Sequence, residues 1–295
     1  MLRTIRRVLW TTIALISLGC LWSLFSHRMP WQQSAQIDKS ITVMTYNTHA
    51  MMIGESLDAK HAMLQHIKRL NADIVCLQEV LVYKNAERLT LPALREAMCE
   101  YPYTYYDFKV YNSKRQFGNV VFSRYPLINK QTIRYESNSN ISSQCDVVIG
   151  QDTLRLIVNH LESFGLESKD FKFDSLTAGS FKESSLNRKL TQTNQLRRKQ
   201  VMKVRRAIHQ SPYPVIAVGD FNAIPLSVVY WTMNLGLNDC FAETSFGRYG
   251  ATYRRQGIGI RIDYIFTSRQ LHPLSCRVDQ ATYSDHFPVI ATIGW

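Results

Sequence analysis

Short apolar runs alternate with amphipathic segments along most of the chain, and this pattern predicts an α/β fold. The predicted strands are residues 41–46, 74–77, 118–122, 147–149, 154–158, 215–218, 260–267 and 287–293. Helical spacing of apolar residues predicts helices over 57–70, 91–99, 187–209 and 227–235. Residues 150–152 are Gly-Gln-Asp between two of these strands, which predicts a hairpin.

The N-terminus has a different pattern. Arg3, Arg6 and Arg7 precede residues 8–25, which carry no charge and reach the lower length limit for a membrane-spanning helix. Flanking arginines favour a cytoplasmic N-terminus. We therefore expect residues 1–29 to hold cytoplasmic arginines and a single-pass membrane anchor. Residues 30–40 are then a linker, and residues 41–295 form a domain outside the cytoplasm. A cleaved signal or lipoprotein peptide and a buried helix remain open as alternatives.

Polar residues that suit metal binding or proton transfer stand at the ends of the predicted strands. They occur in TYN (45–47), LQE (77–79), NHL (159–161), GDFN (219–222), RIDYIF (261–266) and SDHFPV (284–289). Strand ends deliver rigid side chains to the rim of a sheet. Each motif alone is commonly structural, since a lone Asn forms turns and a lone His is often satisfied in the core. Their joint occurrence in one domain indicates a single active site.

Three of these residues suit a hard divalent cation. Mg²⁺ prefers carboxylate and amide oxygens, which Asn47, Glu79 and Asp285 offer. A cation held there can neutralise charge on phosphoryl oxygens, which phosphodiester hydrolysis requires.

The other residues suit the remaining steps of that hydrolysis. Asp220 can orient a water, and the Asn222 amide can donate to a phosphoryl oxygen. His160 and His286 are candidate acid or base groups because imidazole titrates near neutral pH. Asp263 can hold one of the two imidazoles in the required tautomer.

The formal net charge of +12, from 35 basic and 23 acidic residues, favours an anionic partner. Nucleic acid, a phosphorylated small molecule and an anionic lipid surface all fit. The predicted helix 187–209 is rich in Lys and Arg and has no acid, so it forms either a solvated face or a polyanion-binding face. Six cysteines without CxxC spacing argue against an ordinary structural zinc site, and one disulfide among Cys99, Cys145, Cys240 and Cys276 remains open. Residues 163–186 have no clear period and form a lid or an insertion.

The six motifs, in this order, resemble the endonuclease/exonuclease/phosphatase superfamily of deoxyribonuclease-like, metal-dependent phosphoesterases, here of a membrane-anchored bacterial type. Residues 118–126 and 250–253 give two softer matches, and the resemblance covers residues 41–295. It implies a four-layer α/β sandwich in which two mixed sheets pack face to face with helices outside. A catalytically silent binding protein on this scaffold is the competing class, and the intact polar set argues against it.

The resemblance also implies the roles of individual residues and the cofactor. Asn47 and Glu79 resemble metal ligands, and Asp285 falls at a metal-associated or base-orienting position. Asp220 resembles the residue that positions water, and Asn222 resembles the one that supports the transition state. His286 resembles the histidine that contacts the phosphate or acts as the base, paired with Asp263. His160 resembles the second histidine. The implied cofactor is Mg²⁺, with Mn²⁺ as the alternative. We expect a monomeric nuclease, with a phospholipid or small phosphoester as the alternative substrate.

Overall fold

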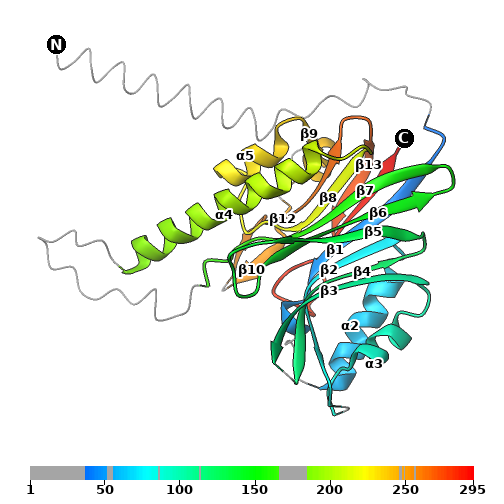
Figure 1. The fold of residues 1–295 in the computed structure, drawn as a ribbon, viewed down its shortest axis with the longest axis vertical. Helices are drawn as coiled ribbons and strands as arrows, with labels where there is room; N and C mark the ends of the chain where they lie inside the picture. Colours follow the sequence, from blue (N-terminus) through cyan, green and yellow to red (C-terminus); the bar gives the residue numbers. More distant parts are fainter. Residues whose placement is uncertain are drawn as a thin grey trace, which may run out of the picture.

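The computed structural model describes residues 37–51, 56–85, 87–112, 114–165, 185–245, 248, 250–255 and 257–295. Two six-stranded sheets pack face to face, and helices cover their outer faces (Figure 1). The predicted sandwich of two mixed sheets with outer helices is therefore confirmed. Residues 8–25, where the membrane anchor is expected, lie outside the described residues. No helix within the described ranges is long and apolar enough to span a bilayer.

The first sheet has the strand order β13-β14-β1-β2-β4-β3. Its strands are β1 (Ser40–Asn47), β2 (Ile74–Tyr83), β3 (Tyr103–Asn112), β4 (Arg115–Ser123), β13 (His272–Val278) and β14 (Val289–Gly294). Helices α2 (Leu57–Arg69) and α3 (Leu91–Ala97) pack on its outer face, and a short 3₁₀ helix, η2 (His49–Met51), follows β1. Only the β1–β2 pair in this sheet is parallel.

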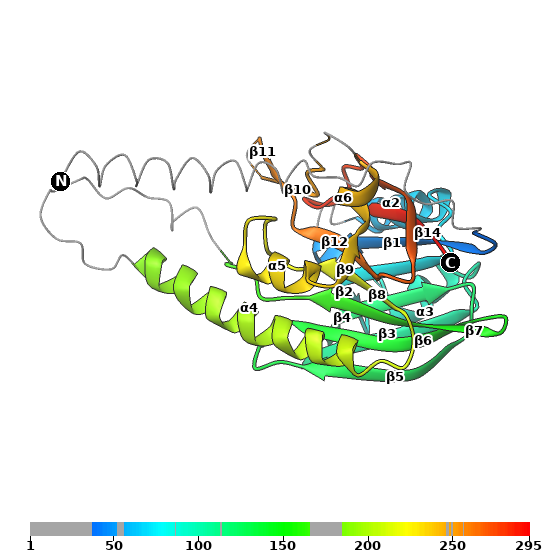
Figure 2. The ribbon, with the colours of Figure 1, turned by 90° about the horizontal axis from the view of Figure 1, so that it is seen from above.

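The second sheet has the strand order β5-β6-β7-β8-β12-β9. Its strands are β5 (Leu127–Arg134), β6 (Ile141–Ile149), β7 (Asp152–His160), β8 (Val215–Asp220), β9 (Leu237–Asp239) and β12 (Asp263–Ser268). Helices α4 (Ser185–His209) and α5 (Val228–Asn234) lie side by side on its outer face (Figure 2). Helix α6 (Cys240–Thr244) and the hairpin of β10 (Tyr253–Arg255) and β11 (Ile258–Ile260) complete the described elements. The only parallel pair here is β7–β8.

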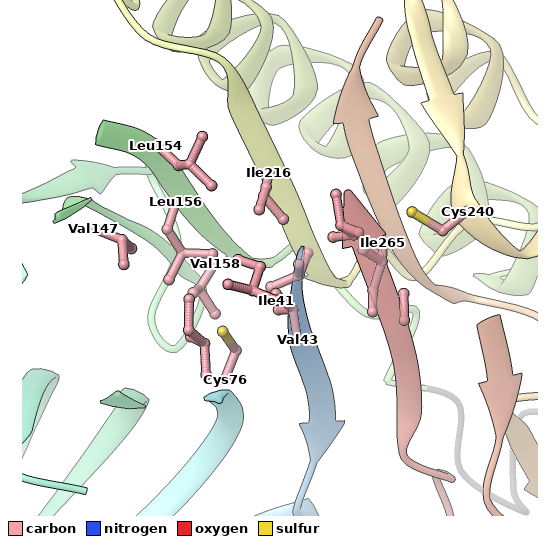
Figure 3. Close-up of a cluster of buried hydrophobic side chains, with 14 of the residues drawn as sticks. Ile41, Val43, Cys76, Val147, Leu154, Leu156, Val158, Ile216, Cys240 and Ile265 are labelled. Atoms are coloured by element: carbon pink, nitrogen blue, oxygen red, sulfur yellow. The ribbon is translucent and has the colours of Figure 1, made fainter. Parts of the chain in front are cut away.

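Alternation along the strands divides the apolar side chains into three layers. On β1, Ile41 and Val43 face the second sheet, whereas Met44 and Tyr46 face α2 and α3. The layer between the sheets also contains Cys76, Val158, Ile216 and Ile265 (Figure 3). Both faces of the central strands are therefore buried, which explains their nearly continuous apolar sequences.

The predicted helix 187–209 is confirmed as α4, but its buried face differs from the predicted one. Val201 and Val204 pack into the layer beneath α4 and α5 as expected, whereas Leu190, Leu196 and Ile208 are only half-buried. The other buried positions on α4 are Thr193, Arg197 and Gln200.

Arg197, one of the basic residues expected on the exposed face of α4, is 2% exposed. Its Nε donates to the Glu162 carbonyl at 2.8 Å, and its guanidinium lies 4.2 Å from the centre of the Phe164 ring. Gln200, on the same face, holds both the backbone N–H and the carboxylate of Glu162. These contacts fix the backbone just after β7, so Arg197 belongs to the packing of the fold and not to a solvated or polyanion-binding face.

Each strand of the two sheets that the sequence pattern did not predict is an edge strand. β3 and β13 are the edges of the first sheet, and β5 and β9 are the edges of the second. The predicted strand 260–267 is interrupted, since the Thr252 hydroxyl accepts hydrogen bonds from the N–H groups of Ile262 and Asp263.

All five described cysteines (Cys76, Cys99, Cys145, Cys240 and Cys276) are free thiols, so the disulfide left open above does not form among them.

Gly219→Ala is expected to destabilise the protein by about 3 kcal/mol or more. Gly219 has a φ of +129°, and an added Cβ would lie 2.0 Å from the Asn159 carbonyl oxygen on the paired strand β7. Gly150→Ala is the control: its φ is +61° and no atom lies within 4 Å of the added Cβ, so the cost is about 1–2 kcal/mol. Urea unfolding of both variants measures the difference, and equal losses would contradict the close approach at Gly219.

Candidate active site

The site lies where the layer between the two sheets reaches the ends of the central strands. Asn47 lies an even number of residues after Ile41 and Val43 on β1, so it is on the side of the strand that faces the second sheet. Asp220 stands in the same relation to Ile216 and Val218 on β8. The same alternation places His160 on β7 and Asp263 on β12 on that side. In the second sheet His160 pairs in register with Asp220, and Asp220 pairs with Asp263. The three side chains therefore form one row across three neighbouring strands.

Glu79 reaches this row because β2 is irregular at that point. The β2–β4 register shifts between Leu77 and Val80, and Glu79 has a left-handed φ of +54°. Such strain in a non-glycine residue is typical of functional positions. The Glu79 carboxylate accepts a hydrogen bond from Asn47 Nδ2 at 3.0 Å and lies 3.2 Å from His160 Nε2.

His160 thus gains the acidic partner that no sequence motif identified. Burial opposes the charged imidazole, but the hydrogen bond and negative charge of Glu79 outweigh it and raise the pKa of His160 above its usual value. Burial likewise opposes the Glu79 carboxylate, yet His160 and Asn47 together lower the pKa of Glu79 to about 2. Each of the two groups therefore favours the charged form of the other.

Asp220 is the most enclosed carboxylate of the site, with 1% of its surface exposed. Its oxygens accept hydrogen bonds from Asn47 Nδ2 at 3.0 Å, from the Asn222 N–H at 2.8 Å and from Asn222 Nδ2 at 3.1 Å. Burial and the charge of Asp263 raise the pKa of Asp220 to about 6. A carboxylate with a raised pKa is a stronger base, which suits a group that orients and deprotonates water.

His286 is held between two acids. Its Nδ1 lies 2.9 Å from Asp263 Oδ2, and its Nε2 lies 3.8 Å from Asp220 Oδ2. Burial opposes the charged ring, but the charges of Asp263 and Asp220 outweigh it and raise the pKa of His286 to about 10. The imidazole is therefore protonated at neutral pH in the metal-free protein.

Two neighbours that the sequence did not single out hold the His286–Asp263 pair. Thr252 Oγ1 donates to Asp263 Oδ2 at 2.7 Å, and the Tyr253 ring lies 4.8 Å from the His286 ring. Both belong to the 250–253 match, which was the available signal. Ser284, in the SDH motif, donates to the Asn47 carbonyl and accepts from the His286 N–H, so it ties the segment before β14 to β1.

Asn222 is fixed close to Asp220. It has a left-handed φ of +49°, and its Nδ2 donates to the Leu161 carbonyl at 3.0 Å as well as to Asp220. Both amide hydrogens are thus engaged. Donation to a phosphoryl oxygen requires one of these bonds to be exchanged for the substrate.

The structure does not place Asp285 among the clustered groups. Its Oδ1 accepts a hydrogen bond from Ser284 Oγ at 3.3 Å and lies 3.5 Å from His49 Nδ1, and its side chain is about a quarter exposed. The Asn47 side chain is also not oriented to bind a cation among these groups. Its Nδ2 donates hydrogen bonds to Glu79 and Asp220, whereas its Oδ1, the atom that would bind the cation, accepts a hydrogen bond from the His49 N–H at 2.9 Å. Ligation by Asn47 requires its amide to turn about the Cβ–Cγ bond. No sequence motif singled out His49.

The donor set nevertheless fits a divalent cation. One group of ligand atoms comes from Glu79, His160 and Asp220 and a second from Asp220, Asp263 and His286, with the atoms of each group within 4.8 Å of one another. Carboxylate oxygens dominate both groups, as a hard cation prefers. The first group also has an amide at hand in Asn47, so it is the better fit.

Comparison with known sequences supplies the family. The sequence model of the endonuclease/exonuclease/phosphatase family matches residues 44–286, which include every clustered residue described above. The chain belongs to this family. Its members are phosphoesterases that depend on a divalent metal, and the chain is therefore an enzyme that hydrolyses phosphoester bonds. No curated protein matches the chain in sequence.

Solved structures share the fold of this family member at low sequence identity. An endonuclease/exonuclease/phosphatase from Beutenbergia cavernae is 17% identical with a TM-score of 0.66, over 87% of this chain and 72% of that one. Truncated TDP2 from Caenorhabditis elegans is 18% identical with a TM-score of 0.60, over 87% and 98%. A family protein from Leptotrichia buccalis is 16% identical with a TM-score of 0.61, over 86% and 100%.

Proposed function

We propose that the chain is a Mg²⁺-dependent phosphodiesterase whose site is shared between the two sheets. One observation supports this most strongly: a continuous series of contacts joins His160, Glu79, Asn47, Asp220, His286 and Asp263. Asn47 and Glu79 come from the first sheet, and His160, Asp220 and Asp263 come from the second. Side chains from both sheets thus line one site.

In this proposal Glu79 and Asn47 hold the cation, with Asp285 as a further ligand or a group that orients the base. The bound cation would neutralise the developing charge on the phosphoryl oxygens. Asp220 accepts a proton from the attacking water as the water oxygen bonds to phosphorus; the bond from phosphorus to the leaving oxygen breaks, and the leaving alkoxide takes a proton from solvent. His286 in its protonated form donates to a phosphoryl oxygen, Asp263 fixes its ring, and Asn222 donates to the same phosphate. His160 orients Glu79.

Nucleic acid is the first candidate substrate because the net charge is +12 and the family includes nucleases. A second observation favours a phosphodiester at a membrane. Ile224 and Leu226, which closely follow Asn222, are 43% and 56% exposed and place apolar surface near the site. We also propose that residues 8–25 anchor the chain, with the catalytic domain outside the cytoplasm.

Hydrolysis assays of the full chain with Mg²⁺ test these proposals. Matched panels of DNA, RNA, sphingomyelin vesicles and inositol phosphates should include a substrate whose cleavage His286→Ala abolishes. Cleavage of nucleic acid alone supports the nuclease, and cleavage of the lipid alone supports the second candidate. Equal turnover by His286→Ala would contradict the site itself.

Removal of divalent metal is expected to abolish this turnover, and Mg²⁺ is expected to restore it. The reason is that the Glu79 and Asp220 carboxylates leave the site anionic and repel a phosphodiester unless a cation is bound. Activity after treatment with EDTA, followed by titration with Mg²⁺, Mn²⁺ and Ca²⁺, measures the dependence. Turnover that persists in EDTA would show that no metal is needed.

A further inference from the structure

Apolar side chains are concentrated on one part of the surface. Five of the eleven exposed large apolar residues in the described ranges lie within positions 224–235, with exposed fractions of 43–73%. They are Ile224, Leu226, Val228, Trp231 and Leu235, here called the α5 surface. Single exposed apolar residues are ordinary, but a contiguous group indicates an interaction.

The α5 surface points away from the protein core. Val229, Tyr230 and Met233 on the other side of α5 pack against the second sheet. Val228 and Trp231 are spaced by three residues and so occupy the opposite side of the helix, and Leu235 follows as the exposed C-cap residue. Trp231 meets the Tyr230 ring edge-on at 5.7 Å, but all three side chains remain largely exposed within the described part of the chain.

The neighbouring helix α4 adds positive charge on the same side of the molecule. Val201 and Val204 of α4 pack in the same layer as the inner face of α5, and the two helices lie side by side on the second sheet (Figures 1 and 2). The outward side of α4 carries Met202, which is 61% exposed, and the exposed residues Arg198, Lys199 and Arg206.

The charge of this region is almost entirely of one sign. From residue 185 to residue 238 the only acidic residue is Asp220, which is buried in the active site. A surface depression of about 690 Å³ on α4 is lined by Met202, Lys203, Arg205, Arg206, His209 and Gln210. An anionic head group of a lipid would find both apolar and basic contacts there.

We propose that the α5 surface and the basic side of α4 dock on an anionic lipid bilayer. Exposed aliphatic residues with a Trp, beside Lys and Arg without acids, are the composition of surfaces that lie in a membrane interface. A nucleic acid would be attracted by the charge but would leave Val228 and Leu235 in water. Charge complementarity together with apolar exposure therefore selects the bilayer.

Docking in this way would bring the rim of the active site to the head-group layer. Ile224 and Leu226, the first residues of the α5 surface, closely follow Asn222 in the sequence. β1 begins only 14 residues after the proposed anchor, at most about 50 Å of extended chain. The tether therefore keeps the domain near the membrane. The docking surface does not depend on which phosphodiester is cleaved.

A nitroxide label on the full chain, mixed with lipid vesicles, tests the proposal. Leu235→Cys places the label on the α5 surface, and Ile258→Cys on β11 is the matched control, since the two native residues are 73% and 70% exposed. Cys20→Ser and Cys99→Ser in both proteins limit labelling to the introduced thiol, as the other cysteines are buried. The vesicles contain phosphatidylcholine with or without phosphatidylglycerol.

At position 235, the collision rate of the label with a water-soluble nickel complex is expected to fall severalfold when phosphatidylglycerol is present, and only then. Its collision rate with oxygen is expected to rise under the same condition. The label at 258 should remain in water. Arg206→Gln with Lys199→Gln should weaken the effect at 235. Catalytic turnover is not measured, so a wrong reaction assignment leaves this test unaffected.

Three results would overturn the proposal. Equal exposure of the two labels in anionic vesicles would show that the surface does not touch lipid. Protection of position 235 without vesicles would show that another part of the chain or a second copy covers it. Protection that appears only when DNA is added would assign the surface to nucleic acid.

Discussion

Asp220→Asn is expected to lower kcat by about 10³-fold while the domain stays folded. The carboxylate is the proposed acceptor of the water's proton, and an amide of the same shape cannot take that proton. Asp220 sits at the end of β8, pairs in register with both His160 and Asp263, and accepts hydrogen bonds from Asn47 and Asn222. Its loss therefore removes the basic group while most of the surrounding contacts remain.

Initial rates at saturating Mg²⁺, with circular dichroism of the same samples, measure this effect. Asp58→Asn makes the same chemical change at an exposed position in the first turn of α2 and should leave kcat unchanged. Asp220→Asn with more than a tenth of the wild-type kcat would remove Asp220 from the proposed mechanism.

Asp263→Asn is expected to lower kcat by about 10²- to 10⁴-fold, because it releases His286 from its proposed orientation and charge state. Asp263 is the first of the charges that raise the pKa of His286 to about 10. Without it, that pKa should fall in the metal-free protein. A nuclear magnetic resonance titration of the His286 ring compares the two proteins directly.

The same substitution predicts a pH dependence of stability. The pKa of His286 is about 10 in the folded protein and 6.5 in the unfolded chain, so protonation of this ring stabilises the folded state. This stabilisation is fully present below pH 6.5 and disappears as the pH rises to about 10. The difference in unfolding free energy between wild type and Asp263→Asn should therefore be larger at pH 6 than at pH 10. Urea unfolding without metal measures it, and a difference that grows with pH would contradict the proposed charge state.

The central strands were predictable from the sequence because both of their faces are buried. β1, β2, β7 and β8 appear as apolar runs, and the polar residues at their ends indicated the site. β5, by contrast, is exposed over most of its length, and β13 is only partly buried. Edge strands lack a continuous apolar run, so periodicity does not separate them from loops.

The partners within the site were less predictable than its members. Glu79 was expected as a metal ligand, but its contact with His160 depends on the irregularity in β2, for which the motif LQE carries no signal. Arg197 shows the same limit on α4. The backbone carbonyl and aromatic ring that it meets come from residues 162 and 164, and helical periodicity cannot reveal partners outside the helix.

The position of β14 has a consequence for how the domain assembles. β14 lies inside the first sheet, between β13 and β1, and pairs Gly294 with Ser40, near the opposite end of the domain's sequence. β1 therefore gains its partner on that side only when β14 folds, and His286, in the segment just before β14, joins the site at the same step. A chain in which β14 has not folded lacks both a complete first sheet and a complete active site.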